Sequence, residues 1–77
     1  MSNKAEKEFL KAVGERIAFY RKQKGLTQEE LGYTLDMEDS NISRIENGRA
    51  NLTLLTCLRI CKALDIQIGQ LFNSDLE

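Results

Sequence analysis

The sequence predicts an all-α fold in which five helices form one domain. Apolar residues recur at spacings of three and four along most of the chain, as in amphipathic helices. The period-2 alternation of strands does not extend beyond a residue or two. The 77 residues contain no proline, and five glycines separate the periodic segments. A chain of this length allows one domain, which we expect to span residues 1–77 with a core at about 9–73 and short flexible ends.

Residues 4–24 form the first predicted helix. Its apolar stripe consists of Phe9, Leu10, Val13, Ile17 and Tyr20. Gly25 follows a basic last turn, which is a common way to end a helix and complement its dipole. Tyr20, like Tyr33 further along the chain, is expected to be a partly buried packing residue.

A second helix of about eight residues begins at a capping box. The Thr27 hydroxyl can accept from the backbone N–H of Glu30, and the Glu30 side chain can reach back to the N–H of Thr27. Leu31 and Leu35 supply the apolar face of this helix. Asp36 and Met37 form the break that follows it.

The third helix is predicted from about Asp39 to Asn47, with Ile42 and Ile45 inward and Gly48 at its end. Residues 49–52 form a loop, and Thr53 caps a fourth helix. The apolar stripe of that helix is predicted to contain Leu54, Cys57, Leu58, Cys61 and Leu64. Ile68, Leu71 and Phe72 indicate a short fifth helix before a frayed tail, and Leu71, Phe72 and Leu76 are assigned to the core or to a dimer interface.

Residue types exclude several classes of function. The chain has no histidine and only two cysteines, so it cannot complete a four-ligand structural zinc site. Cys57 and Cys61 are interpreted as small core residues kept as thiols; a redox switch or a metal shared between protomers is the alternative. Without a histidine, a Gly-rich phosphate loop or a Ser/Asp constellation, we predict no enzyme, no cofactor, no metal and no small-molecule ligand. No apolar run approaches a membrane span or a signal peptide, which predicts a cytoplasmic protein.

The formal charge of −1 argues against a nucleic-acid partner, but the charges are unevenly distributed. Residues 1–25 carry seven Lys/Arg and three Glu, a balance of +4, which leaves −5 for residues 26–77. The basic part can therefore still face a phosphate backbone.

Two short helices separated by three or four residues are typical of helix-turn-helix geometry. Gly32 lies where the two helices approach each other and where bulk would be penalised. With Ile42 and Ile45 buried, the side chains left for a groove, solvent or the flanks of the helix are Asp39, Ser40, Asn41, Ser43 and Arg44.

The run GLTQEELG at residues 25–32, followed by NISRIENG at 41–48, resembles the Cro/C1-type (XRE-like) helix-turn-helix family of lambda-repressor-like domains. The similarity continues through Leu54, Leu58, Ile60, residues 62–64 and residues 71–72. It covers roughly residues 10–73. The resemblance implies a five-helix lambda-repressor-like bundle and a homodimeric transcriptional regulator of double-stranded DNA, in particular a repressor, whose helix at about 39–47 enters the major groove.

The resemblance also implies site residues. Gln28 matches a residue that bonds a phosphate and braces a recognition-helix side chain. The positions that reach base edges or flanking phosphates are Glu38, Asp39, Ser40, Ser43 and Arg44, and Asn41 is added as a groove residue. Arg44 is the candidate for a guanine, although an ion pair with a nearby acid on its own helix is the alternative. The residues that match the loop gripping the DNA backbone are Asn47, Arg49 and Asn51.

Arg21 and Glu46 match a buried salt bridge between the first and third helices. Lys22 and Lys24 can bind phosphate or form a solvated basic helix end. The sequence departs from the family at three positions. Glycine is usual where this chain has Asp36, and Glu38 is a poor helix cap. The carboxylate of Asp39 repels phosphate unless it accepts a hydrogen bond from cytosine N4 or is neutralised. The acidity of this region supports a second hypothesis, a protein-interaction module such as an antitoxin or adaptor.

Overall fold

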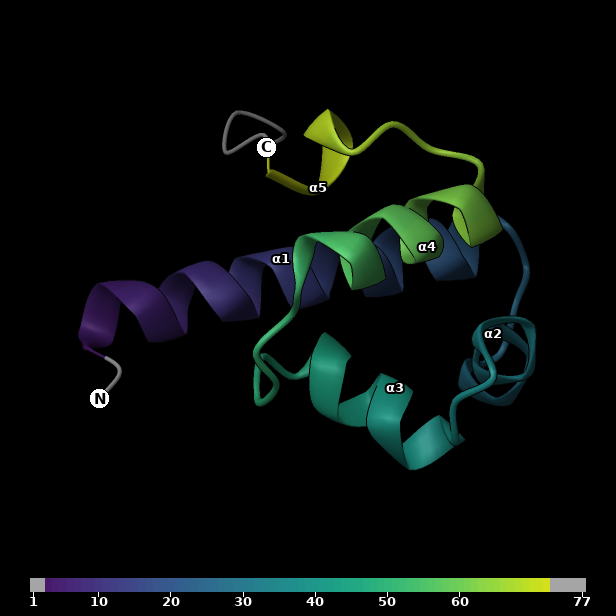
Figure 1. Cartoon of the computed structure of the whole chain (residues 1–77), viewed down its shortest axis with the longest axis horizontal. Coiled ribbons are helices and arrows are strands. Elements are labelled where there is room, and N and C mark those ends of the chain that lie inside the picture. The colour runs from purple at the N-terminus through teal and green to yellow at the C-terminus, as the bar shows by residue number, and fades with distance from the viewer. Residues whose placement is uncertain (1–2, 73–77) are drawn as a thin grey trace.

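The computed structural model describes residues 3–72, and within that range it contains five helices and no strand (Figure 1). The helices are α1 (Lys4–Gln23), α2 (Gln28–Leu35), α3 (Asp39–Glu46), α4 (Leu54–Leu64) and α5 (Gly69–Phe72). The predicted all-α, five-helix fold is confirmed. Of the residues predicted to form flexible ends, 4–8 belong to α1, whereas 1–2 and 73–77, which include Leu76, lie outside the described residues.

The long helix α1 forms the back of the bundle, with α4 packed across its C-terminal half (Figure 1). The α2–α3 pair lies to one side of these two helices, and α5 lies beyond α4 at the opposite side. The pair is joined to the rest of the domain by two helices, because α1 contacts α3 and α4 contacts α2.

Local capping determines where three of the helices begin. Thr27 Oγ1 accepts from Glu30 N at 3.0 Å, and Glu30 Oε1 accepts from Thr27 N at 2.9 Å, which completes the predicted capping box of α2. Thr53 caps α4 through Thr56 N at 3.0 Å, as predicted. Asn3 caps α1 in the same way as Thr27 caps α2. Glu38, by contrast, makes no side-chain cap for α3, as its residue type predicts.

The turn between α2 and α3 contains Asp36, the residue at which the sequence departs from the glycine usual in the family. This residue adopts the left-handed conformation, with φ 59° and ψ 45°. The chain then folds back so that Met37 N donates to the carbonyl of Gly32 at 2.8 Å. A Cβ on Gly32 would lie 2.5 Å from the carbonyl oxygen of Met37, so any side chain there would push the turn away from α2.

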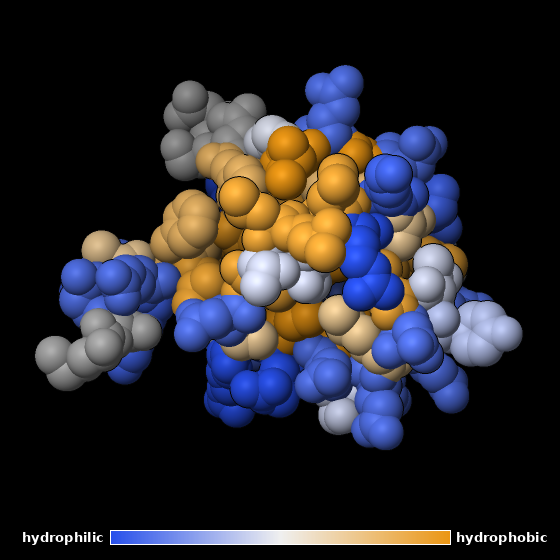
Figure 2. Space-filling view, in the orientation of Figure 1, coloured by the Kyte–Doolittle hydropathy of each residue, from blue (hydrophilic) through white to orange (hydrophobic). Residues whose placement is uncertain are grey.

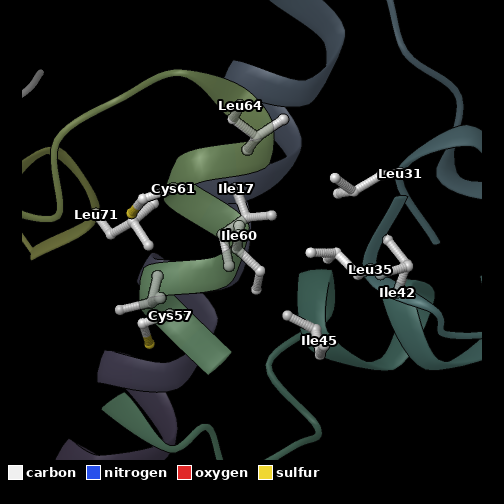
Figure 3. Close-up of a cluster of buried hydrophobic side chains, with 11 residues drawn as sticks. Ile17, Leu31, Leu35, Ile42, Ile45, Cys57, Ile60, Cys61, Leu64 and Leu71 are labelled. Carbon is white, nitrogen blue, oxygen red and sulfur yellow. The ribbon is translucent and has the colours of Figure 1, made fainter. Parts of the chain in front are cut away.

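The core lies between the two halves of the bundle (Figure 3). Ile17 of α1 and Ile60 of α4 occupy its middle. One side of the cluster is formed by Leu31, Leu35, Ile42 and Ile45 of α2 and α3, and the other by Cys57, Cys61 and Leu71. Burial raises the pKa of both thiols.

Several apolar residues do not lie where the periodicity placed them. Leu54 and Leu58 are exposed, because the buried face of α4 is formed by Cys57, Ile60, Cys61 and Leu64 and both leucines lie beside it. Phe9 is also exposed. The expectation that Tyr33 is partly buried is wrong: it is 89% exposed, since Leu31, Gly32 and Leu35 turn the opposite face of α2 inward.

Candidate nucleic-acid interface

The orientation of α3 follows from which of its residues are buried. Ile42 and Ile45 are nearly inaccessible and point toward Ile60 (Figure 3). Ser40 and Arg44, four residues apart, therefore lie on the opposite, exposed face of the helix. Asn47 follows the last turn on the same side. A short polar helix surface held from behind by two isoleucines is what a groove-binding helix requires.

A buried ion pair holds the C-terminal end of α3. Arg21 Nε donates to Glu46 Oε2 at 2.6 Å, and Arg21 Nη2 donates to Glu46 Oε1 at 3.0 Å. Arg21 Nη1 also donates to the carbonyl of Leu26 at 2.8 Å, so the guanidinium ties α1 to both α3 and the segment before α2. Hydrogen bonding to Glu46 raises the pKa of Arg21 above its usual value, against the opposing effect of burial.

Gln28 joins the same network from the first position of α2. Its Nε2 donates to Glu46 Oε1 at 2.9 Å, so one carboxylate connects α1, α2 and α3. Because Glu46 accepts three hydrogen bonds from two other helices, the rotation of α3 about its axis is fixed at its C-terminal end.

Close backbone packing adds a second constraint on α3. A Cβ on Gly14 of α1 would clash with the carbonyl oxygen of Ile45 and lie 2.5 Å from that of Glu46. The absence of a side chain at this position therefore lets α1 contact the backbone of α3 directly. Sequence analysis did not identify Gly14, because nothing along α1 distinguishes this glycine from one that merely weakens a helix.

The structure divides the predicted DNA-binding residues into three neighbourhoods around α3. The first is a surface hollow that Lys22, Gln28 and Asn47 share. Ser43 adjoins it, because Asn47 Nδ2 donates to Ser43 Oγ at 3.4 Å. Residues from three separate segments of the chain thus meet where the N-terminus of α2 approaches the C-terminus of α3.

The second neighbourhood lies on the other side of α3, where Asn41, Arg44 and Asn51 line a shallow hollow beside the 49–52 loop. Arg44 Nη2 donates to the carbonyl of Arg49 at 3.2 Å. Within residues 3–72, the salt bridge that the structure contains joins Arg21 to Glu46. Arg44 therefore does not pair with an acid on its own helix and instead donates to the 49–52 loop.

The third neighbourhood is acidic. Glu38 and Asp39 lie at the start of α3 and share a shallow hollow with Glu29, Tyr33 and Met37. All three acids are exposed. Ser40 follows them at the start of the outward face. Lys24 is exposed at the end of α1 and lines none of these three hollows.

Arg59 of α4 is a further positioning residue that sequence reasoning missed. Its Nη2 donates to the carbonyl of Leu35, the last residue of α2, at 2.7 Å. A cation at the C-terminal end of a helix stabilises the unpaired carbonyls there. Arg59 therefore holds the helix-turn-helix from behind, and a lone arginine in an apolar helix gives no sign of that role in the sequence.

Among the helices of residues 3–72, none has the length and apolar character that a membrane crossing requires.

Comparisons with known proteins agree with this geometry. Residues 17–71 match the helix-turn-helix family model HTH_3. An HTH-type transcriptional regulator, y4dJ of Sinorhizobium fredii, is 38% identical over 56 residues, which are 73% of each chain. The control protein C.MunI of Mycoplasma sp is 35% identical over 65 residues, covering 83% of this chain and 86% of the relative.

Among solved structures, the restriction-modification controller protein C.AhdI of Aeromonas hydrophila superimposes with a TM-score of 0.77 at 35% identity. The match covers 82% of this chain and 96% of that protein. The family model covers well over half of the chain. The two sequence relatives match this chain over most of their own length. The chain belongs to the Cro/C1-like (XRE-like) helix-turn-helix family HTH_3, a family of DNA-binding transcriptional regulators and not of enzymes.

Proposed function

We propose that this regulator is a homodimeric repressor that reads an operator by placing α3 in the major groove of DNA. The observation that carries the proposal is the fixed, outward-facing polar surface of α3, with Ser40 and Arg44 on one side and Ile42 and Ile45 buried on the other. An α-helix fits the major groove, where each base pair presents a distinct pattern of donors and acceptors.

Arg44 is the residue proposed to read a base. One of its guanidinium nitrogens donates to the carbonyl of Arg49, which leaves other N–H groups for the O6 and N7 acceptors of guanine. The loop contact holds a long side chain close to α3 before DNA arrives, which reduces the conformational entropy lost on binding. Ser40 and Asn41 lie beside it on the same helix.

The hollow shared by Lys22, Gln28 and Asn47 is proposed to hold a phosphate of the backbone. Lys22 supplies positive charge, and the first turn of α2 supplies backbone N–H groups and the positive end of a helix dipole. The Gln28 amide is already held by Glu46, so its position relative to α3 is fixed. Such contacts set the register of the protein on DNA without carrying sequence information. Arg49 and Asn51 are proposed to contact the backbone from the other side of α3.

The acids near α3 lower the expected affinity but are compatible with the proposal. Glu46 is buried and already paired with Arg21. Glu38 and Asp39 remain exposed at the start of the helix, where a carboxylate repels phosphate or accepts from the N4 amino group of cytosine. We therefore expect weak non-specific binding and a strong dependence of affinity on salt.

A homodimer doubles the contact area and places two copies of α3 on successive turns of one duplex, about 34 Å apart. A regulator with this activity is expected to act in the cytoplasm.

Selection of binding sites from random duplexes at low salt tests the proposal, followed by measurement of affinity for the selected site. Arg44→Ala should weaken specific binding by about 5- to 150-fold and relax the preference at one base pair. Lys22→Ala should weaken binding to all duplexes alike and reduce its salt dependence. Lys62→Ala, an exposed change on α4, is the matched control. If no duplex is enriched over random sequence, the proposal fails.

A second candidate function is that of a protein-interaction module. It is favoured by the nearly fully exposed Tyr33 beside Glu29, Glu38 and Asp39, an aromatic and acidic surface that suits a basic partner. In that case Tyr33→Ala abolishes partner binding while Arg44→Ala has no effect in any DNA assay.

A further inference from the structure

The N-terminal half of α1 carries a row of cations that we define as the lysine stripe: Lys4, Lys7 and Lys11. These residues are three and four positions apart, so their side chains adjoin along one face of the helix. The same spacing continues to Gly14, which touches the backbone of α3, and to Ala18, which lines the first of the three hollows beside α3. The lysine stripe therefore lies on the side of α1 that faces α3.

The residue that follows α3 and its cap packs directly on the lysine stripe. A Cβ on Gly48 would lie 2.7 Å from Lys11 Cα and 2.8 Å from Lys11 N, so the two backbones touch here. The next residue, Arg49, is exposed and belongs to the loop proposed to contact the DNA backbone. From this contact the N-terminal half of α1 projects past the end of α3 (Figure 1). Figure 2 shows hydrophilic side chains on this projecting end and along the lower edge, where α3 lies in Figure 1.

The charges of the lysine stripe are not neutralised within the described part of the chain. Its three residues are exposed, and within residues 3–72 none of them forms a salt bridge. Glu8 and Glu15 follow Lys4 and Lys11 by four positions. In a helix, however, the favourable order places the glutamate before the lysine. The stripe thus presents a row of unpaired cations, which attracts an anionic partner.

We propose that the lysine stripe binds phosphates of the DNA strand that borders the major groove on the side of the 49–52 loop. This inference rests on the proposed function and deepens it, because it adds a second binding surface outside the helix-turn-helix. A lysine ammonium is a point charge on a flexible stem, which suits a phosphate oxygen. The stripe therefore contributes affinity and register, while α3 reads the sequence.

The dimensions of α1 match those of a duplex. At 1.5 Å per residue, the stripe extends for about 10 Å, and phosphates follow one another about every 3.4 Å along a strand, so the stripe spans about three of them. Lys22 lies about 16 Å from Lys11 along α1, beyond the contact of Gly14 with α3. This separation exceeds the width of the major groove, about 12 Å. Lys22 and the stripe therefore address opposite strands, with α3 between them.

The lysine stripe also accounts for DNA binding by a chain whose net charge is −1. The exposed acids Glu38 and Asp39 lie at the start of α3, whereas the stripe adjoins the other end of that helix through Gly48. Phosphates near the stripe are thus bound away from these carboxylates.

The salt dependence of the affinity for the selected operator tests the proposal. A triple variant with Lys4→Gln, Lys7→Gln and Lys11→Gln removes the charges and keeps residues that favour a helix. Each lost phosphate contact lowers the slope of log affinity against log salt by about 0.9, so the slope should fall by about 2.7. Between about 50 and 200 mM salt, the wild type should then lose about 40-fold more affinity than the variant. Lys62→Gln, which removes one exposed charge from α4, is the matched control for Lys7→Gln and should leave the slope unchanged.

Ethylation of single phosphates locates the contacts. Ethyl groups on one edge of the major groove should weaken binding of the wild type but not of the triple variant, whereas Lys22→Ala should remove the interference on the opposite strand. Circular dichroism checks that each variant keeps its helices. A triple variant with the wild-type slope, or a Lys7→Gln effect no larger than that of Lys62→Gln, overturns the proposal.

The same measurements separate the lysine stripe from the proposed function. Phosphate contacts do not depend on sequence, so the slope is also measured on an unselected duplex. An enriched operator whose slope the triple variant leaves unchanged refutes the stripe alone. A slope that falls as expected, with no duplex enriched over random sequence, refutes the operator-reading function alone.

Discussion

Removal of the Glu46 carboxylate is the perturbation whose cost the structure defines best. In Glu46→Ala, the Arg21 guanidinium keeps its hydrogen bond to the Leu26 carbonyl but loses two charged hydrogen bonds in a buried position. Gln28 Nε2 loses its acceptor as well. Leaving one member of a buried ion pair without its partner costs about 3–5 kcal/mol.

This loss is large compared with the stability of the domain. At about 0.05–0.15 kcal/mol per residue, a chain of 77 residues is stable by roughly 4–12 kcal/mol. Glu46→Ala should therefore unfold a weakly stable domain and lower the melting temperature of a more stable one by about 12 °C or more. Since α3 loses its anchor, the same variant should also weaken DNA binding.

Urea unfolding followed by circular dichroism, at one fixed chain concentration, measures the effect. Glu8→Ala, which removes an exposed carboxylate from α1, is the matched control and should stay within about 0.5 kcal/mol of the wild type. Replacing both partners, as in Arg21→Met with Glu46→Leu, should recover much of the loss, because no buried charge remains. If Glu46→Ala is destabilised by less than about 1 kcal/mol, the pair does not anchor α3 and the reasoning fails.

Three further predictions follow from the backbone and from the thiols. In an exposed helix, a Gly→Ala change raises the free energy of unfolding by about 1 kcal/mol. In Gly14→Ala the new Cβ meets the α3 backbone, so we expect the free energy of unfolding to fall by about 2–3 kcal/mol in thermal unfolding. Gly69→Ala, with open space around it, is the control, and equal behaviour of the two variants would contradict the close approach of α1 and α3. Asp36→Gly should raise the free energy of unfolding by about 0.5–1 kcal/mol, because glycine adopts φ 59° without strain; a loss of stability would show that the aspartate is not strained. Burial raises the pKa of Cys57 and Cys61. Native protein should therefore react with a disulfide reagent at neutral pH about 100-fold more slowly than urea-unfolded protein. Equal reaction rates would mean that the thiols are exposed. Since the folded thiols hold their protons more tightly, their contribution to stability is complete below the unfolded value of 9.0 and is lost as the pH rises through the folded pKa.

The sequence by itself determined the features that depend on neighbouring residues. Hydroxyl and carboxylate groups three residues apart predicted the start of α2, and Thr53 predicted the start of α4. The spacing of Ile42 and Ile45 predicted which side of α3 is buried, and hence that Ser40 and Arg44 face outward. These predictions succeed because a cap or a helical repeat involves atoms within one or two turns.

The apolar residues of α4 form two adjoining faces. Only the tertiary structure decided which of these faces is covered by another helix. Leu54 and Leu58 fit the apolar repeat of α4 as well as Cys57 and Cys61 do, yet only the cysteines are covered. Periodicity specifies the residues that share a stripe, whereas burial depends on how far α1 and α5 extend over it. The roles of Gly14 and Arg59 were hidden for the same reason, because each acts on backbone atoms more than twenty residues away.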